Sequence, residues 1–380
     1  MTSNHRPCAT SPRARLFMTL TLGLLWLTPS AALAQDTCPE APPDGITPAS
    51  DAINNCLARS LSVALPQGNY LVTSTVNVAR QGAELTSVAG QTATLVAATN
   101  FIGDIIFAGQ GGNNYAVHDI HINGRLDAGR SCVAGQGANL RANGSSFNLF
   151  NIESIHSPCA NWQVAGDFFH IFNNFLWHSG TPAPAGPVGD GLGIFPGLGG
   201  EVNNNTIADA TDIALVLGGG SRWVHNNLIQ NVNYYGLTGL NVGSFDGSGD
   251  HTGAVFENNT IQSGLNLLGI GLLLGAHPWS TDPFFDVRNA GTVRGNNISG
   301  AVINMVVEGV ANIQSMSGNT TSNHQGTNGV GTNCFDPTGG ADPRYEYIAW
   351  HFGGPIQGGA FGMQMDVVVG HPENACIPQG

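Results

Sequence analysis

Two aspartates, Asp190 and Asp212, occupy equivalent places in the chain, because each stands directly before a short apolar segment. If these segments are neighbouring parallel strands offset by one residue, the two carboxyl groups lie roughly 6 Å apart. Carboxyl groups at that distance can share the acid and the base or nucleophile roles in the cleavage of a glycosidic bond. The alternative is structural, since aspartates at such points also cap turns and end loops.

Three histidines are expected to assist this pair, namely His170, His178 and His225. Flat aromatic side chains are predicted on the outer surface of the same strands, namely Phe172, Phe175, Trp177 and Trp223. Aromatic faces beside hydrogen-bonding groups suit sugar rings, so we expect the two tryptophans to be stacking platforms and the phenylalanines to extend a substrate-binding surface. The alternative is that loop 178–189 or the C-terminal tail covers these side chains, because large apolar patches are seldom bare.

A repeated pattern predicts the strands that position these side chains. Residues 202–218, 224–243 and 256–275 each contain a short alternating strand, two asparagines and a second alternating strand that ends near a glycine. The repeats begin 22 and 32 residues apart, and the longer interval carries a polar insert at 243–252. Short alternating strands repeated at this period indicate a β-solenoid.

Asparagine suits the bend between the two strands, because it tolerates the left-handed backbone conformation. Amides stacked on successive coils roughly 4.8 Å apart can also bond to one another. A strand, an asparagine corner and a second strand in this order resemble the right-handed parallel β-helix of the pectin-lyase-like superfamily. The resemblance implies an all-β fold, a single right-handed parallel β-helix.

Strand alternation predicts which residues point into this solenoid. The expected inward column is Val117, Phe150, Ile171, Val202, Val224, Phe256 and Val293. The next inward column is expected to be Ile122, Ile155, Leu176, Ile207, Ile229, Ile261 and Ile298. The side chains between these columns, and the loops inserted between coils, are then available for binding.

The resemblance also makes polysaccharide elimination an alternative chemistry, and in lyases of this fold an arginine or lysine can be the base. Arg222 is the candidate, with Arg125, Arg130 and Arg294 as the other arginines expected at the outer face. Hydrolysis needs no cofactor, whereas a lyase could use Ca²⁺ to stabilise the enolate. The aspartate motifs expected of polygalacturonases are absent.

Four segments are predicted along the chain. Residues 1–34 resemble a secretory signal peptide, with arginines, an apolar run and Ala32-Leu33-Ala34 before Gln35. The mature chain is therefore expected to be secreted or periplasmic. The other segments are an N-terminal cap with the first strands at 35–80, the β-helix at 81–330 and a C-terminal cap at 331–380. In the first cap, Thr47 and Pro48 predict the start of a helix that ends near Leu57.

Six cysteines remain after the signal peptide, and an even number in an exported chain predicts disulfides. Their grouping along the sequence favours the pairs Cys38–Cys56, Cys132–Cys159 and Cys334–Cys376. Buried free thiols are the alternative.

The charge of the mature chain limits its partners. Lysine is absent, and 9 arginines face 25 acidic residues after the signal peptide, a net charge of −16. Nucleic acid and anionic membranes are therefore not expected as partners, since both attract basic surfaces. We predict a carbohydrate-active enzyme that cleaves a polysaccharide by hydrolysis or elimination. The alternatives are a non-catalytic carbohydrate binder or adhesin and a sugar epimerase; the sequence leaves the oligomeric state open.

Overall fold

A computed structural model describes residues 35–323 and 367–369, with gaps at 110, 134–136, 183–185, 245–248, 265–266, 276–286, 302 and 309–312. The predicted signal peptide, most of the predicted C-terminal cap and the pair Cys334–Cys376 lie outside the described residues.

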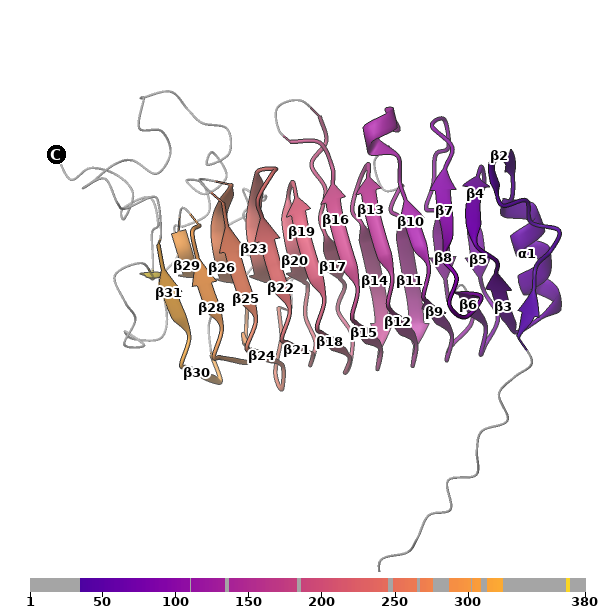
Figure 1. Cartoon of the computed structure of the whole chain (residues 1–380). Coiled ribbons are helices and arrows are strands. Elements are labelled where there is room, and N and C mark those ends of the chain that lie inside the picture. The colour runs from indigo at the N-terminus through magenta and orange to yellow at the C-terminus, as the bar shows by residue number, and fades with distance from the viewer. Residues whose placement is uncertain are drawn as a thin grey trace, which may run out of the picture. The chain divides into compact units, whose positions relative to one another are not determined.

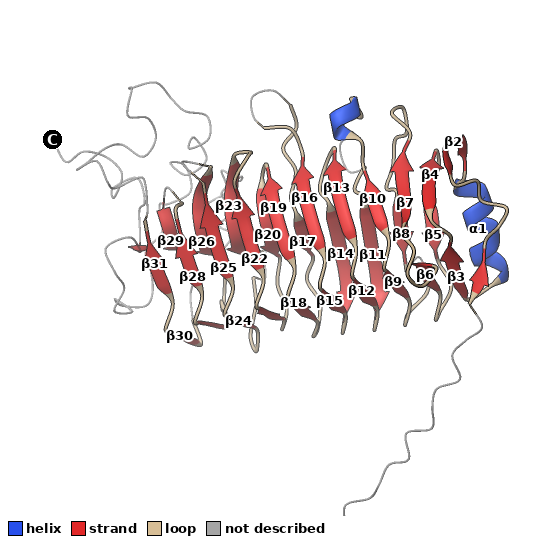
Figure 2. Cartoon of the chain, in the orientation of Figure 1, coloured by secondary structure: helices blue, strands red, loops and turns tan. Residues whose placement is uncertain are grey.

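Within the described residues the strands form three parallel sheets, here called A, B and C, and each coil contributes one strand to each sheet in turn. Figure 1 shows successive coils stacked side by side in chain order, from the indigo to the orange part of the chain. Figure 2 shows that strands make up almost all of this stack. The predicted right-handed parallel β-helix is therefore confirmed.

The strands of sheet A are β1 (Asp36–Thr37), β3 (Ser62–Leu65), β6 (Glu84–Ser87), β9 (Ala116–His118), β12 (Asn148–Phe150), β15 (His170–Phe172), β18 (Glu201–Asn203), β21 (Trp223–His225), β24 (Val255–Glu257), β27 (Thr292–Arg294) and β30 (Ser315–Ser317). Those of sheet B are β2 (Asp44–Pro48), β4 (Gly68–Val72), β7 (Ala93–Ala97), β10 (His121–Asn123), β13 (Glu153–Ser157), β16 (Phe175–Ser179), β19 (Thr206–Ala210), β22 (Leu228–Asn231), β25 (Thr260–Ser263), β28 (Asn297–Ser299) and β31 (Thr320–Ser322). Those of sheet C are β5 (Val76–Val78), β8 (Ile106–Ala108), β11 (Leu140–Ser145), β14 (Trp162–Asp167), β17 (Leu192–Ile194), β20 (Ile213–Leu217), β23 (Gly236–Val242), β26 (Leu268–Gly275), β29 (Ile303–Glu308) and β32 (Val367–Val369).

The two asparagines of the repeat have different roles. The first of each pair, such as Asn204 and Asn226, has a positive φ of 55° or 56° and makes the bend between sheets A and B. The second is buried, and Asn227 is typical: its Oδ1 accepts from the amide and the side chain of Asn205, both at 3.0 Å. Its own side chain donates to Asn259 Oδ1 at 2.9 Å. A continuous ladder of buried amides therefore fixes the register of the coils.

The inward columns are confirmed except in one coil, where the predicted register is wrong by one residue. Leu149, not Phe150, pairs with the inward residues of both neighbouring coils. Asn151, with a φ of 54°, holds the bend position in this coil, so the strand before it ends at Phe150. Consequently Ser154 takes the inward place predicted for Ile155.

The helix of the N-terminal cap is α1 (Ser50–Arg59), which contacts strands of the first coil. It begins two residues later than predicted, because Thr47 and Pro48 belong to β2 and the Thr47 hydroxyl donates to Asp44 at 2.7 Å. The expected buried face of Ile53, Cys56 and Leu57 is confirmed.

Disulfides join Cys38 to Cys56 and Cys132 to Cys159, as predicted. The first ties α1 to the residue that directly follows β1, and the second closes the loop that carries the 3-10 helix η1 (Leu126–Ala128) onto the next coil. Among the described residues, no helix is long and apolar enough to cross a membrane.

Candidate functional site

Asp190 and Asp212, here called the acid pair, lie at the corner where the chain passes from sheet B to sheet C. Leu192 of β17 pairs with Leu215 of β20, so Asp190 is level with Ile213 and Asp212 lies one residue behind. The Ile213 amide donates to Asp190 Oδ1 at 3.3 Å. Both aspartates are half-buried.

The surroundings of the acid pair favour its protonated forms. Burial and, next in size, the negative charge of Asp212 together raise the pKa of Asp190 to about 8, although the Ile213 hydrogen bond opposes them. Burial raises the pKa of Asp212 to about 6. Two carboxyl groups this close titrate together, so around neutral pH one proton is shared between them.

Two glycines beside Asp190 differ in what they allow. Gly193 is buried, and a Cβ there would have Asp190 Oδ2 at 3.9 Å and nothing nearer than 3.8 Å, which is ordinary contact. A Cβ on Gly191 would lie 2.4 Å from Ile207 Cγ2 and from the Ala214 carbonyl oxygen. Gly191 is therefore required by packing, whereas a small side chain could replace Gly193 without a clash.

The loop before Asp190 is closed by polar contacts at its base. Thr211 Oγ1 donates to the Ser179 carbonyl at 2.7 Å and accepts from the Gly189 amide at 3.0 Å. The Ser179 hydroxyl donates to the Gly189 carbonyl at 3.1 Å. Asp190 is consequently held by a fixed backbone even though it follows a loop.

A group of rings lies at the same corner, on the sheet B side. His178 stacks on Tyr234 with ring centroids 3.9 Å apart, and His156 contacts both His178 and Trp177. Burial, together with the charge of His156, lowers the pKa of His178, so its ring is neutral at neutral pH. His178 is only 8% exposed, which makes it part of the support of this corner rather than an open surface.

Asp209 holds this ring group in place. Its Oδ1 accepts from the amides of Val232 at 2.8 Å and Asn233 at 2.9 Å, and its Oδ2 accepts from Trp177 Nε1 at 2.9 Å. Burial alone would raise the pKa of Asp209, but these hydrogen bonds outweigh it and leave the pKa below its ordinary value. The indole N–H of Trp177 is therefore hydrogen-bonded within the protein.

A separate pocket of about 360 Å³ lies at the corner where the chain passes from sheet C to sheet A. Its lining includes Phe168, His170, Glu201 and Trp223, and glycines form much of the remainder. Phe168 is 61% exposed and Trp223 is 46% exposed. We call this pocket the Trp223 groove.

Glu201 is the polar centre of the Trp223 groove. Its Oε1 is 2.9 Å from His225 Nε2 and accepts from Asn203 at 2.8 Å, while its Oε2 is 3.5 Å from His170 Nε2. His225 also stacks on Trp223, with ring centroids 4.0 Å apart. His170 and His225 thus accompany Glu201 and lie apart from the acid pair.

Arg222 is 1% exposed and lies behind the same groove. Its guanidinium lies 4.8 Å from the Phe169 ring centroid and donates to the Gly166 carbonyl at 2.8 Å. Arg130 is also buried, and its guanidinium donates to the Phe101 carbonyl at 3.0 Å. The expectation that these two arginines reach the outer face is therefore wrong, because backbone carbonyls and a phenyl ring enclose each of them.

The remaining predicted aromatic residues lie outside both sites. Phe172 stacks on Phe150, with ring centroids 4.9 Å apart, and Phe150 stacks in turn on His118. Phe175 is 38% exposed at the start of β16. The outer surface of sheet A therefore carries a short aromatic ladder whose ring faces are mostly turned toward one another.

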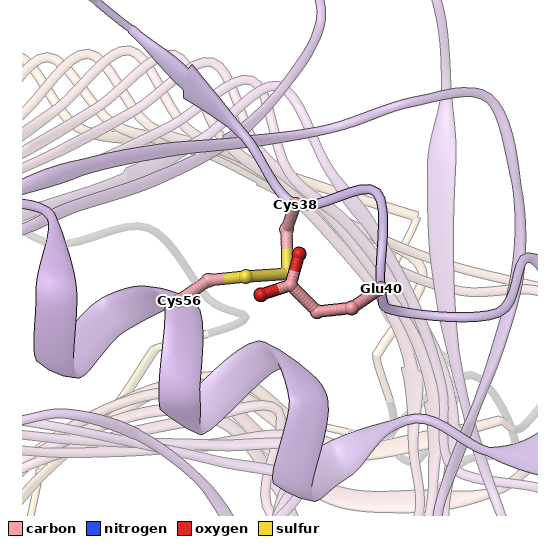
Figure 3. A group of neighbouring side chains, drawn as sticks. All are labelled: Cys38, Glu40 and Cys56. Atoms are coloured by element: carbon pink, nitrogen blue, oxygen red, sulfur yellow. A yellow bond between two sulfur atoms is a disulfide. The ribbon is translucent and has the colours of Figure 1, made fainter.

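One group of donor atoms with the proximity needed for a metal occurs among the described residues, at Cys38, Glu40 and Cys56. Figure 3 shows the two sulfur atoms joined in a disulfide beside the Glu40 carboxylate. Glu40 also pairs with Arg59. Because a metal needs free thiolates, these residues do not fit a metal site.

Sequence reasoning placed all the candidates in one region, whereas the structure divides them between two corners. Glu201 and Phe168, which complete the Trp223 groove, were not proposed as functional residues. Strand alternation could have found Glu201, because it directly precedes the inward Val202 and therefore faces outward, where it pairs with His170 and Trp223 on neighbouring strands. Nothing in the sequence indicated that Tyr234 contacts His178, because Tyr234 reaches His178 from a loop of another coil.

Neither a protein-family model nor a curated protein sequence matches this chain. Solved structures do match its fold. A hyperthermoactive exopolygalacturonase from Thermotoga maritima has a TM-score of 0.52 at 13% identity, over 74% of this chain and 75% of that one. PfbA, a surface adhesin of Streptococcus pneumoniae, has a TM-score of 0.50 at 12% identity, over 76% of this chain and 92% of that one. These similarities concern the fold and agree with the parallel β-helix formed by the three sheets.

Proposed function

We propose that this protein is an exported enzyme that hydrolyses glycosidic bonds in a polysaccharide, with Asp190 as general acid and Asp212 as general base or nucleophile. The acid pair carries the proposal, because its raised pKa values, about 8 and about 6, supply one protonated and one ionised carboxyl group at neutral pH. Hydrolysis of a glycosidic bond needs that combination on either side of the bond.

The proposed reaction uses both members of the pair. Asp190 gives its proton to the glycosidic oxygen as the bond from that oxygen to the anomeric carbon breaks. Asp212 either attacks the anomeric carbon or removes a proton from the water that does so. In the first case water then displaces Asp212 from the anomeric carbon, and Asp190 takes back a proton from that water. In the second case the water oxygen bonds to the anomeric carbon, and the proton that Asp212 has taken returns to Asp190 before the next cycle.

Two further observations support this proposal. A polysaccharide suits a protein whose sites lie along a stack of coils, since solenoids provide long binding surfaces. The two disulfides favour an exported protein, because such bonds persist in oxidising compartments. The exopolygalacturonase with the same fold acts on a carbohydrate by its name, but fold alone does not assign an activity.

A non-catalytic surface binder is the second candidate, favoured by the Trp223 groove and by the similarity to a surface adhesin. Elimination or epimerisation is less well supported, because Arg222 is enclosed and Arg294 Nε is engaged with Glu257 at 2.6 Å. If elimination occurs, the proposal becomes a lyase that uses a cation such as Ca²⁺.

The test is an assay of the mature chain on neutral and uronic polysaccharides, which records new reducing ends and the ultraviolet absorbance of unsaturated products. We expect reducing ends without absorbance. Asp190→Asn and Asp212→Asn should each lower kcat/KM by about 100-fold or more. Asp51→Asn, a change of an exposed carboxylate on α1, is the matched control and should leave kcat/KM unchanged.

Three other outcomes would contradict the proposal. Absorbance from an unsaturated product would identify a lyase. Full activity in either acid-pair variant would remove that aspartate from the chemistry. Retention on a polysaccharide without any cleavage would identify a binding protein.

A further inference from the structure

We infer that the Trp223 groove is a second glycan-binding site, separate from the acid pair, which binds a neutral polysaccharide chain lying along the stack of coils. The inference does not depend on the proposed hydrolysis, because a binding protein and an enzyme could both use such a site.

Trp223 has the features of a prepared stacking platform. Its ring lies against His225, and its Nε1 donates to Glu257 Oε1 at 2.8 Å. Arg294 holds Glu257 in turn. An exposed tryptophan fixed at its edge and on one side loses little conformational freedom when a ligand covers it, which favours binding.

Two glycines in the lining of the groove are packed against phenylalanine rings. A Cβ on Gly199 would lie 2.6 Å from the Phe168 ring, and one on Gly200 would lie 2.9 Å from the Phe169 ring. Both glycines have a positive φ, 59° and 115°. Glycine is therefore required at both positions, and backbone without side chains lines this part of the groove beside the exposed Phe168 ring.

The lining residues show the direction of the groove. Phe168, Glu201, Trp223 and Gly253 belong to four successive coils, so the groove runs along the stack. Phe168 and Trp223 lie two coils apart, which is roughly 10 Å. A volume of about 360 Å³ is at the lower end of the range for small-ligand sites, so the groove suits a short length of a sugar chain.

The polar groups of the groove favour neutral sugars. The Glu201 carboxylate can accept hydrogen bonds from ring hydroxyls, and His170, whose side chain is 57% exposed, can form hydrogen bonds with them. A carboxylate on the sugar would meet the negative charge of Glu201. Arg222 does not offset this repulsion at the surface, because it is buried against Phe169.

The groove and the acid pair are separate sites. They lie at opposite ends of β20, whose five residues span roughly 17 Å. The outward residue between them, Val216, is 1% exposed. A sugar ring held by Trp223 is therefore not the ring that the acid pair would cleave.

The test uses the mature chain with Asp190→Asn and Asp212→Asn together, so that binding is measured without cleavage. The probes are starch, xylan, mannan and a mixed-linkage glucan, with polygalacturonate as the anionic comparison, in affinity electrophoresis and calorimetry. Adding Trp223→Ala should weaken binding of a neutral polysaccharide by about tenfold or more. Trp223→Phe should retain part of the binding, and Ile102→Ala, which removes another exposed apolar side chain, should retain all of it.

A second measurement separates the two sites. In the chain with an intact acid pair, Trp223→Ala should lower kcat/KM on polymers by a larger factor than on short soluble oligosaccharides. If hydrolysis is absent but Trp223→Ala still removes binding, the inference stands and the proposed function fails. Equal binding by Trp223→Ala and the parent, binding of polygalacturonate alone, or no binding to any probe would overturn the inference. Thermal unfolding of Trp223→Ala and Trp223→Phe shows whether lost binding reflects lost folding.

Discussion

Asp190 and Asp212 lie on stacked coils with an offset of one residue, so that the amide donating to Asp190 comes from Ile213, the residue after Asp212. Neither carboxyl group has a basic side chain as a hydrogen-bond partner within the described part of the chain. Burial of both groups, and the charge of Asp212 beside Asp190, therefore outweigh the Ile213 hydrogen bond, and both pKa values rise.

The pH dependence of hydrolysis should follow from these shifts. Asp212 must be ionised and Asp190 protonated, so kcat/KM should fall below about pH 6 and above about pH 8. The measurement is kcat/KM across this range on a soluble oligosaccharide. Because the two aspartates titrate together, the acidic and the alkaline limb of the pH profile both belong to the pair. A substitution of either aspartate should therefore change both limbs. A rate that stays level across the range would contradict the assigned roles.

The acid pair should also make the folded state less stable as pH rises. The folded protein keeps protons that the unfolded chain releases above its ordinary pKa of 3.8, so stability declines from there toward the raised pKa of about 8. Asp190→Asn removes the ionisable group and should raise Tm near pH 8 but hardly near pH 4. Thermal unfolding at both pH values measures this, and an equal change at both would show a cause other than charge.

Asp209 should have the opposite effect, because its pKa is lowered in the folded state. Its stabilisation is present above the ordinary pKa of 3.8 and is lost as pH falls through the lowered value. Asp209→Ala leaves the amides of Val232 and Asn233 without their acceptor and should cost about 2–5 kcal/mol of unfolding free energy at neutral pH. Asp209→Asn keeps one acceptor oxygen and should cost less. Denaturant unfolding distinguishes the three proteins, and similar losses in both variants would show that charge alone matters.

The two asparagines of one repeat should respond differently to substitution. Asn227→Ala leaves the buried Asn205 amide and side chain unpaired and should cost about 2–4 kcal/mol. Asn226→Gly should be nearly neutral, because that residue is exposed and its φ of 56° suits glycine. The same unfolding assay applies to both. A larger loss for Asn226→Gly would contradict the assignment of the bend to the first asparagine and the ladder to the second.

The disulfide between Cys38 and Cys56 closes a separation of 18 residues, for which the chain-entropy account gives about 3 kcal/mol. Replacement of both cysteines by serine should lower the free energy of unfolding by about that amount, because α1 covers the end of the coil stack. Reduction of the parent protein is the control and should lower stability at least as much. Unchanged stability in the double variant would show that the buried face of α1 is sufficient on its own.

The sequence by itself determined the class of fold. Paired asparagines between short alternating strands can stack only if the strands are parallel and in register, so the repeat at 202–275 already implied a parallel β-helix. The grouping of Cys38 with Cys56 and of Cys132 with Cys159 gave both observed disulfides. The place of Asp190 and Asp212 before equivalent strands gave the one-residue offset, because that offset depends only on strand register.

Only the tertiary structure showed which side chains lie together in a site, because strand register alone does not determine this. Phe150 faces outward because Asn151, in a coil without the paired asparagines, takes the bend one residue earlier than alternation predicts. The division of the histidines between two corners depends on the position of each strand around the coil. The alternation of side chains along a strand predicts which face a residue is on, but it does not predict that position. His178 meets Tyr234, and Glu201 meets His170 and His225, across coils whose loops differ in length. Contacts of this kind follow from packing in three dimensions, and so only the folded chain shows which side chains share a site.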